Sequence, residues 1–288
     1  MTLIACLHPH HHRVLLADIL IFSNGPAAPE IELPTRAYVA PDQLRRMAFK
    51  PAAFRRKIVE ISPSLLLLWA GDYNYATVFA KRAKAFFDGV DVNADTISNF
   101  VRTYYRTSAN NFWALIIPFS GDWLCTVGDV THSQSAFAEE YWVAGTGTDL
   151  FRQIVGSLSP RADGAIAPHI DGLRLANDLL AYEINTAQPI LSQFGGGYEV
   201  FYSDQHSFHR VDDIMHFFVL VRRTATTNFH LSHYSHATRQ WYEQDRLYIA
   251  SFATPVGTEQ GLGFVALLSP VYLTTTRSLN RCMCRRNI

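Results

Sequence analysis

The sequence lacks an excess of charge of one sign. Its 25 Lys and Arg side chains equal its 25 Asp and Glu side chains, so the formal net charge is +0. Proteins that bind nucleic acid or anionic membranes by long-range attraction usually carry a basic excess. The composition therefore gives no reason to expect nucleic acid or a membrane surface as a partner.

Cysteine is also scarce and irregularly placed. Four cysteines occur in 288 residues, at positions 6, 125, 282 and 284. A small secreted protein held by disulfides needs more cysteines, and a structural zinc site needs longer spacings than the final pair has. The pattern favours a reducing compartment, and we expect a cytoplasmic protein without a bound metal.

Long apolar runs, internal repeats and low-complexity tracts are missing as well. The polar residues 8–13, four of them His, interrupt the apolar start. This leaves neither a signal-peptide core nor about 20 apolar residues that could span a bilayer. We therefore expect the amino terminus to stay on the folded protein. A solvated turn explains the His cluster better than a metal site does, because clustering alone supplies no coordination geometry.

Hydrophobic residues are abundant, at 48% of the chain, which is ample for a buried core. Their periodicity predicts a hairpin of residues 3–7 and 14–22, then a Pro-rich irregular insertion over residues 23–56 with at most one helical turn. Further elements are expected in the order strand pair (57–61, 65–70), helices (75–87, 96–107), strands (112–119, 123–127, 141–144), helices (149–155, 173–184) and strand pair (198–202, 214–221).

This order of elements predicts an α+β fold, with antiparallel sheets stacked between helical layers. Residues 1–224 would form the core, and residues 225–288 would form a β-rich extension. Asp95 is expected to cap the second helix.

Thr2 is the first candidate for chemistry. A threonine hydroxyl is a poor nucleophile at neutral pH unless a neighbouring base removes its proton. A free α-amine, whose ordinary pKa is about 7.7 to 8.0, can be that base, directly or through water. The small residue behind Met1 permits removal of the methionine, so we expect the mature chain to begin at Thr2.

Two segments carry a resemblance to a known family. Thr2-Leu3-Ile4-Ala5 is followed by Val14-Leu15-Leu16-Ala17-Asp18, and Lys57-Ile58-Val59-Glu60-Ile61 is followed by Pro63, Leu65 and Ala70-Gly71. In both, the spacing resembles that of the N-terminal-nucleophile hydrolases of the proteasome β-subunit type. The resemblance covers residues 2–87 in motif and continues to about residue 221 in the order of elements.

The resemblance implies a threonine peptidase on a four-layer αββα sandwich, acting through an acyl-enzyme without metal or cofactor. It implies that Asp18 holds the Lys57 ammonium, whose charge eases activation of Thr2. The backbone N–H of Gly71 would donate to the oxyanion. Thr146, in the Gly-Thr-Gly-Thr run 145–148, would contact the terminal amine.

The resemblance also suggests how substrate and partners are bound. Trp69 and Tyr73 would border the specificity pocket and exclude a large side chain, and the apolar residues 19–22, with Ile21 among them, replace the polar stretch that pairs with substrate in the family. The expected partners are a peptide or unfolded protein and further copies of the chain, in a ring or another homo-oligomer.

Two of the residues that support the nucleophile in the family are replaced in this chain. Ser192 stands where the family has a second aspartate, and Gly195 stands where it has a serine. Three functions therefore remain open: a threonine peptidase, a catalytically silent binding or structural subunit, and an amidohydrolase for a small amide. A serine triad drawn from Ser203, Asp204, His206 and His209 lacks a nucleophile elbow, so a hairpin turn is the simpler interpretation of that cluster.

Overall fold

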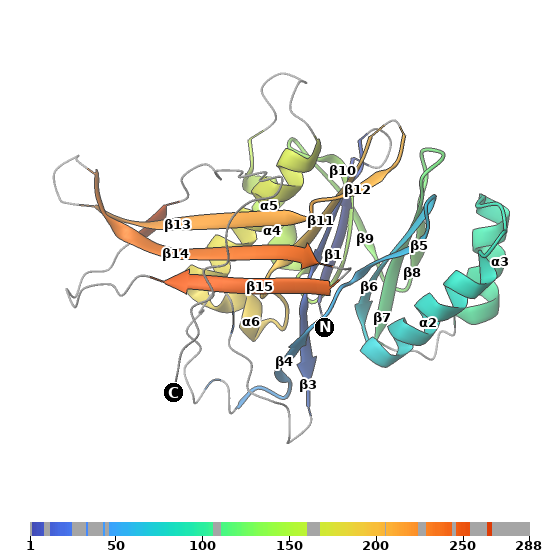
Figure 1. Cartoon of the computed structure of the whole chain (residues 1–288), viewed down its shortest axis with the longest axis horizontal. Coiled ribbons are helices and arrows are strands. Elements are labelled where there is room, and N and C mark those ends of the chain that lie inside the picture. The colour runs from blue at the N-terminus through green and yellow to red at the C-terminus, as the bar shows by residue number, and fades with distance from the viewer. Residues whose placement is uncertain are drawn as a thin grey trace.

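The computed structural model describes residues 2–8, 12–24, 33, 43, 46–105, 111–159, 168–204, 206–223, 229–243, 246–253 and 264–266. Within these residues the protein is α+β, as expected (Figure 1). Every strand pairing in them is antiparallel. Three buried apolar clusters involve a six-stranded sheet, a four-stranded sheet and the helices that pack on them.

The six-stranded sheet has the order β12-β11-β2-β1-β10-β9. The expected hairpin at its centre is confirmed, with Ile4 opposite Ala17 and Leu7 opposite Val14. His10 and His11 of the expected turn lie outside the described residues. The strands are β1 (Leu3–Leu7), β2 (Val14–Asp18), β9 (Thr131–Ser135), β10 (Glu139–Gly145), β11 (Tyr198–Ser203) and β12 (Phe208–Arg210).

The four-stranded sheet has the order β5-β6-β7-β8. Both strand pairs expected over residues 57–70 and 112–127 are confirmed, and β6 joins them because it pairs with β5 on one side and with β7 on the other. The strands are β5 (Ile58–Ser62), β6 (Leu65–Gly71), β7 (Phe112–Pro118) and β8 (Cys125–Val127).

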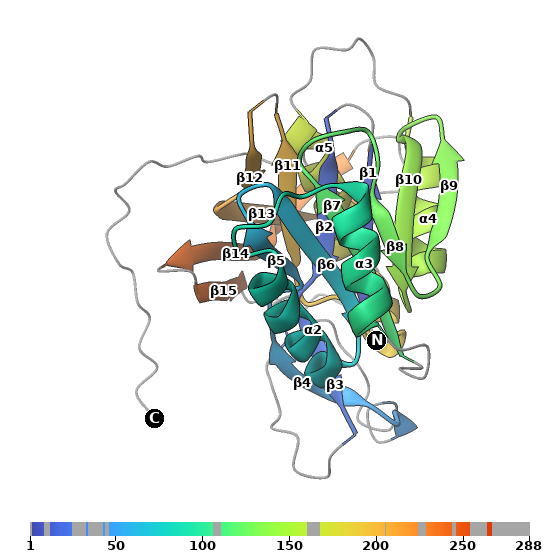
Figure 2. The same cartoon turned by 90° about the vertical axis from the view of Figure 1, so that its right-hand side faces the viewer.

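Helices cover one face of each sheet. Side chains of α2 (Tyr73–Phe86) and α3 (Ala94–Tyr104) pack on the four-stranded sheet, and Figure 2 shows both helices in front of it. Side chains of α4 (Thr148–Ser157) and α5 (Pro168–Thr186) pack on the six-stranded sheet, near the short α6 (Gln188–Leu191). A third apolar cluster joins the other faces of the two sheets. Asn93 caps α3, so the assignment of this cap to Asp95 was wrong; the Asn93 side chain accepts from Thr96 N–H.

The apolar run 14–22 is two strands, because the chain changes sheet at Ile19. Ile19 N–H donates to Gly197 O at 3.1 Å, and β3 (Leu20–Ser23) then pairs with β4 (Lys50–Phe54). The strand β4 lies in the segment expected to be irregular. Its sequence, Lys-Pro-Ala-Ala-Phe, contains a proline and two alanines and shows little of the periodicity by which strands are recognised.

The expected pairing of residues 198–202 with residues 214–221 is wrong. Both edges of β11 are occupied by β2 and β12, so β13 (Asp213–Arg223) enters another sheet instead. That sheet has the order β15-β14-β13-β16 and includes β14 (Phe229–Glu243), β15 (Arg246–Ala253) and β16 (Phe264–Ala266). None of the helices in the described ranges is both long and apolar enough to cross a membrane.

Candidate functional site

Asp18 is the centre of the candidate site. Its Oδ1 accepts hydrogen bonds from the Thr2 hydroxyl, from Leu3 N–H at 2.7 Å and from Lys57 Nζ at 2.7 Å. Its Oδ2 accepts from Gly195 N–H at 3.0 Å. Thr2, Asp18 and Lys57 are each 0% exposed. The three residues that the sequence singles out therefore meet on one buried carboxylate.

Lys57 precedes β5 and reaches across to the end of β2. Besides Asp18, its Nζ contacts the carbonyl oxygen of Leu20 at 2.7 Å. Burial lowers the pKa of Lys57, and the opposing attraction of Asp18 only partly restores it. Lys57 therefore gives up a proton more readily than an exposed lysine does.

The backbone of Thr2 lies against the Gly145–Thr148 turn. Gly147 N–H donates to Thr2 O at 3.3 Å, and Gly145 has φ +101° where a Cβ would stand 1.9 Å from that oxygen. Thr146 Oγ1 accepts from Thr2 N at 3.2 Å and donates to Gln193 O at 3.5 Å. The structure thus brings Thr146 to the nitrogen that would become the terminal amine.

Ser192 does not reach the buried carboxylate. Its hydroxyl accepts from Gln188 Nε2 at 3.0 Å, and among the described residues no hydrogen bond joins it to Thr2, Asp18 or Lys57. The place that the resemblance gives to Ser192 does not predict its contacts, because the chain turns sharply immediately after this residue.

The glycine run 195–197 supplies a hydrogen bond to Asp18, which Ser192 does not. All three residues have positive φ, and a Cβ on Gly195 would stand 2.1 Å from Glu183 Oε2. Gly195 N–H donates to Asp18, while Gly196 N–H donates to the buried Glu183 at 2.9 Å. The sequence indicated only that Gly195 stands where the family has a serine, because backbone donors leave no signature in side-chain identity.

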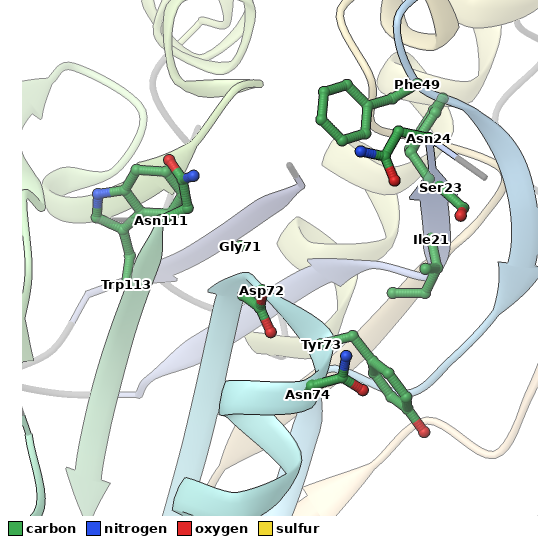
Figure 3. A pocket seen from close by; sticks show the side chains of 11 residues that line it. Ile21, Ser23, Asn24, Phe49, Gly71, Asp72, Tyr73, Asn74, Asn111 and Trp113 are labelled. Carbon is green, nitrogen blue, oxygen red and sulfur yellow. The ribbon is translucent and has the colours of Figure 1, made fainter. Parts of the chain in front are cut away.

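Gly71 ends β6 and lines a hollow of about 390 Å³ (Figure 3). Ile21 and Tyr73 line it too, with Asn111 and Trp113 across from Ile21. Gly71 has φ +98°, and a Cβ would stand 1.9 Å from Asn111 O, so close packing of β7 already demands glycine. Sequence reasoning missed Asn111 and Trp113, because they carry no titratable group.

Trp69 lies at a second hollow, of about 610 Å³, and Tyr73 lines both hollows. Trp69 is 3% exposed, and its ring centroid is 5.9 Å from that of Tyr73. Trp69 packs in the core cluster under α2 and contributes to the wall of this second hollow. The exclusion of a large side chain by Trp69 and Tyr73 stays a prediction.

A second buried carboxylate, Glu199, supports the backbone of Lys57. It accepts Lys57 N–H at 2.6 Å and Ile58 N–H at 3.1 Å. Arg56 Nε at 3.0 Å and the Tyr242 hydroxyl at 2.8 Å complete its partners. Burial, and next the negative charge of Glu199, raise the pKa of Tyr242. The C-terminal sheet is thereby connected to the residue that positions Lys57.

Other clusters of polar side chains among the described residues do not form a competing site. Asp204 Oδ2 and Ser207 Oγ both contact Nε2 of His209, at 2.6 and 3.1 Å. A serine triad needs the two groups on opposite ring nitrogens, so no relay is formed. Ser203 Oγ instead accepts from Arg13 N–H at 3.0 Å. In the described part of the chain, no group of three or more His, Cys, Asp or Glu side chains is arranged to hold a metal ion.

Comparison with known proteins adds no assignment. No protein-family model matches the chain, and no curated protein matches it either.

Proposed function

We propose that this chain is a threonine-type N-terminal-nucleophile hydrolase that cleaves peptide or other amide bonds through an acyl-enzyme on Thr2. The observation that carries the proposal is the shared Asp18 oxygen, which contacts both the Thr2 hydroxyl and Lys57 Nζ in a fully buried setting. The two sheets with a helix pair on each would then be the αββα sandwich of such enzymes.

The mechanism requires a free amine on Thr2, and hence removal of Met1. The Thr2 hydroxyl attacks the amide carbonyl, and the amine receives its proton, directly or through water. Proton transfer to the leaving nitrogen breaks the C–N bond, and water then hydrolyses the ester. Neither a metal nor a cofactor takes part in these steps.

Lys57 and Thr146 assist the proton transfers. The positive charge of Lys57 beside Thr2 lowers the proton affinity of both the hydroxyl and the amine. Thr146 Oγ1 holds the Thr2 nitrogen at 3.2 Å and orients it. Asp18 acts as a positioning residue, because it fixes Lys57 and the Thr2 hydroxyl together.

Gly71 is the proposed oxyanion donor. It lies at the end of β6, beside the 390 Å³ hollow in which the acyl group or leaving group would lie. Backbone N–H groups aimed at a developing oxyanion typically contribute about 10²-fold to 10³-fold in rate. Assembly of several copies into a ring or another oligomer remains part of the proposal by resemblance.

A catalytically silent binding or structural subunit is the second candidate. Two observations favour it: Thr2 is 0% exposed, and the Ser192 hydroxyl bonds to Gln188 rather than to the site. The same buried cluster would then serve stability alone. The two candidates differ in one measurable property, the reactivity of Thr2.

The test is acylation of the processed protein. Protein whose intact mass shows loss of Met1 is incubated with a β-lactone, and the adduct is located by mass spectrometry. We expect an adduct on Thr2 that Thr2→Ala abolishes, that Thr2→Ser retains in part and that Lys57→Ala slows by about 10² or more. Thr186→Ala, which removes an exposed helical hydroxyl, is the control and should label normally. Absence of any adduct on folded, processed protein would support the silent subunit.

A further inference from the structure

The second hollow has an unusual charge. Of the thirteen described residues that line its 610 Å³, five are basic and none is acidic. The basic residues are Arg55, Arg56, Lys81, Lys84 and Arg246. Because the whole chain has a net charge of +0, this is a local concentration of positive charge and not a reflection of composition. We call this space the cationic hollow.

Most of these cations are not neutralised within the described part of the protein. Arg56 pairs with Glu199 at 3.0 Å and lies 4.0 Å from Glu60. The other four have no carboxylate within 4.0 Å among the described residues. Arg55 donates to a backbone carbonyl and lies 5.9 Å from the centre of the Tyr73 ring. The cationic hollow therefore attracts an anion that the described protein does not supply.

The remaining lining restricts the shape of that anion. Trp69, Ala76 and Ala80 are buried and apolar, and they belong to the cluster under α2. Lys81 and Lys84 lie one and two turns beyond Thr77 on the same helix face. A ligand with a short apolar stem and a terminal carboxylate fits such a surface, because the stem covers apolar side chains while the charge meets the lysines.

The cationic hollow adjoins the candidate site through the chain itself. Arg55 and Arg56 directly precede Lys57, and Trp69 and Tyr73 stand on either side of Gly71 in sequence. Tyr73 lines both hollows. The cationic hollow and the Gly71 hollow therefore share a wall at Tyr73, so one extended ligand is able to enter both.

The C-terminal sheet supplies part of the wall. Arg246 and Leu247 begin β15, where Leu247 pairs with Tyr242 of β14. Tyr242 in turn donates to Glu199, which holds the Lys57 backbone. The extension is thus built into both the cationic hollow and the support of Lys57.

We infer that the cationic hollow binds an acidic side chain, that of Glu or Asp, on the acyl side of the scissile amide. This inference rests on the proposed function and names its substrate class: peptides or amides with a carboxylate next to the cleaved bond. One exposed ion pair is worth up to about fivefold in binding. Several cations acting on one carboxylate therefore predict a preference for Glu over Gln of about 10-fold to 100-fold.

The experiment compares matched peptide electrophiles that differ only in the residue at the reactive carbonyl: Glu, Gln, Leu or Lys. The rate of adduct formation on Thr2 of the processed full chain is measured by intact mass. We expect Glu to react fastest and Lys slowest, and the Glu-to-Gln ratio to fall as ionic strength rises from about 0.05 to 0.5 M. Lys81→Gln/Lys84→Gln should lower that ratio about tenfold.

The control variant is Arg82→Gln/Arg102→Gln, which removes two charges from α2 and α3 outside the lining. Arg82 lies over the Tyr104 ring at 5.5 Å. This variant should keep the Glu-to-Gln ratio. Equal rates for Glu and Gln, or a ratio that survives in Lys81→Gln/Lys84→Gln, would overturn the inference.

A binding measurement separates this inference from the proposed function. N-acetylglutamate methylamide and its glutamine counterpart are titrated with the natural protein and both variants, and binding is followed by ligand-detected NMR. Binding of the Glu compound that the lysine variant loses supports the cationic hollow even if Thr2 never reacts. Absence of such binding refutes the cationic hollow even if Thr2 is labelled by other probes.

Discussion

Replacement of Asp18 by Asn tests the core of the site. The change keeps the shape of the side chain but removes its charge, so the buried ammonium of Lys57 loses its only anionic hydrogen-bond partner among the described residues. In addition, an amide NH₂ placed at the Oδ2 position would face Gly195 N–H, now 3.0 Å away, with donor against donor.

The expected cost follows from these two effects. Leaving one member of a buried ion pair unpaired typically costs about 3 to 5 kcal/mol, and an unsatisfied buried donor adds about 1 to 3 kcal/mol. Relaxation and loss of the Lys57 proton reduce the sum, so we expect the free energy of unfolding to fall by about 3 to 5 kcal/mol. Domains of this kind are stable by about 5 to 15 kcal/mol, so the variant would be severely weakened.

The assay is urea unfolding at pH 7, followed by circular dichroism, in a double-mutant cycle with Lys57→Met. Because Lys57→Met removes the buried charge, Asp18→Asn/Lys57→Met should be no less stable than Asp18→Asn alone. A loss below about 1 kcal/mol in the single variant, or strictly additive effects in the double variant, would refute a buried, charge-coupled pair.

Three further predictions follow from described contacts. His216 is buried, and burial lowers its pKa to about 4, below the ordinary 6.5. The free energy of unfolding should therefore fall by up to about 3 kcal/mol as pH falls from 6.5 through 4. Thermal unfolding of His216→Gln should lack this part of the pH dependence. The pKa of Lys57 is lowered below 10.5, so the stability of the natural protein relative to Lys57→Met should rise with pH and level off above 10.5; a fall would contradict the assignment. Tyr242→Phe removes the 2.8 Å hydrogen bond to Glu199 and should cost about 1 to 3 kcal/mol in urea unfolding, whereas Tyr248→Phe on the neighbouring strand should cost less than about 0.5 kcal/mol.

The fold was predictable where the local pattern is strong. The β1 and β2 hairpin, β5 to β8 and the helices α2 to α5 follow from apolar periodicity and turn residues, and most of their ends lie within a few residues of the expected ones. The short helix α6 was not expected. The strand β9, with the sequence Thr-His-Ser-Gln-Ser, has no such pattern, because it lies at a sheet edge with few buried side chains. The partners of β13 could not be predicted, since they depend on which edges of β11 are already occupied.

The candidate site, like the fold, could be predicted from the sequence only in part. Thr2, Asp18 and Lys57 could be predicted, because their side chains carry the interactions and their spacing is regular. Glu199 was missed, since its partners lie more than 40 residues away in sequence, in a region before β5 and on β14. The role of Gly195 rests on a backbone N–H, which any residue except proline carries.

The central position of β1 restricts the conformations that are open to Thr2. Strand β1 lies between β2 and β10 with hydrogen bonds on both sides, and the carbonyl oxygen of Thr2 accepts from Gly147 N–H. Fixing a backbone residue costs about 1 to 2 kcal/mol in conformational entropy, and here folding has already met that cost. If Thr2 is the nucleophile as proposed, its hydroxyl would therefore meet a reacting group from a single orientation, with little rotational or backbone freedom left to lose.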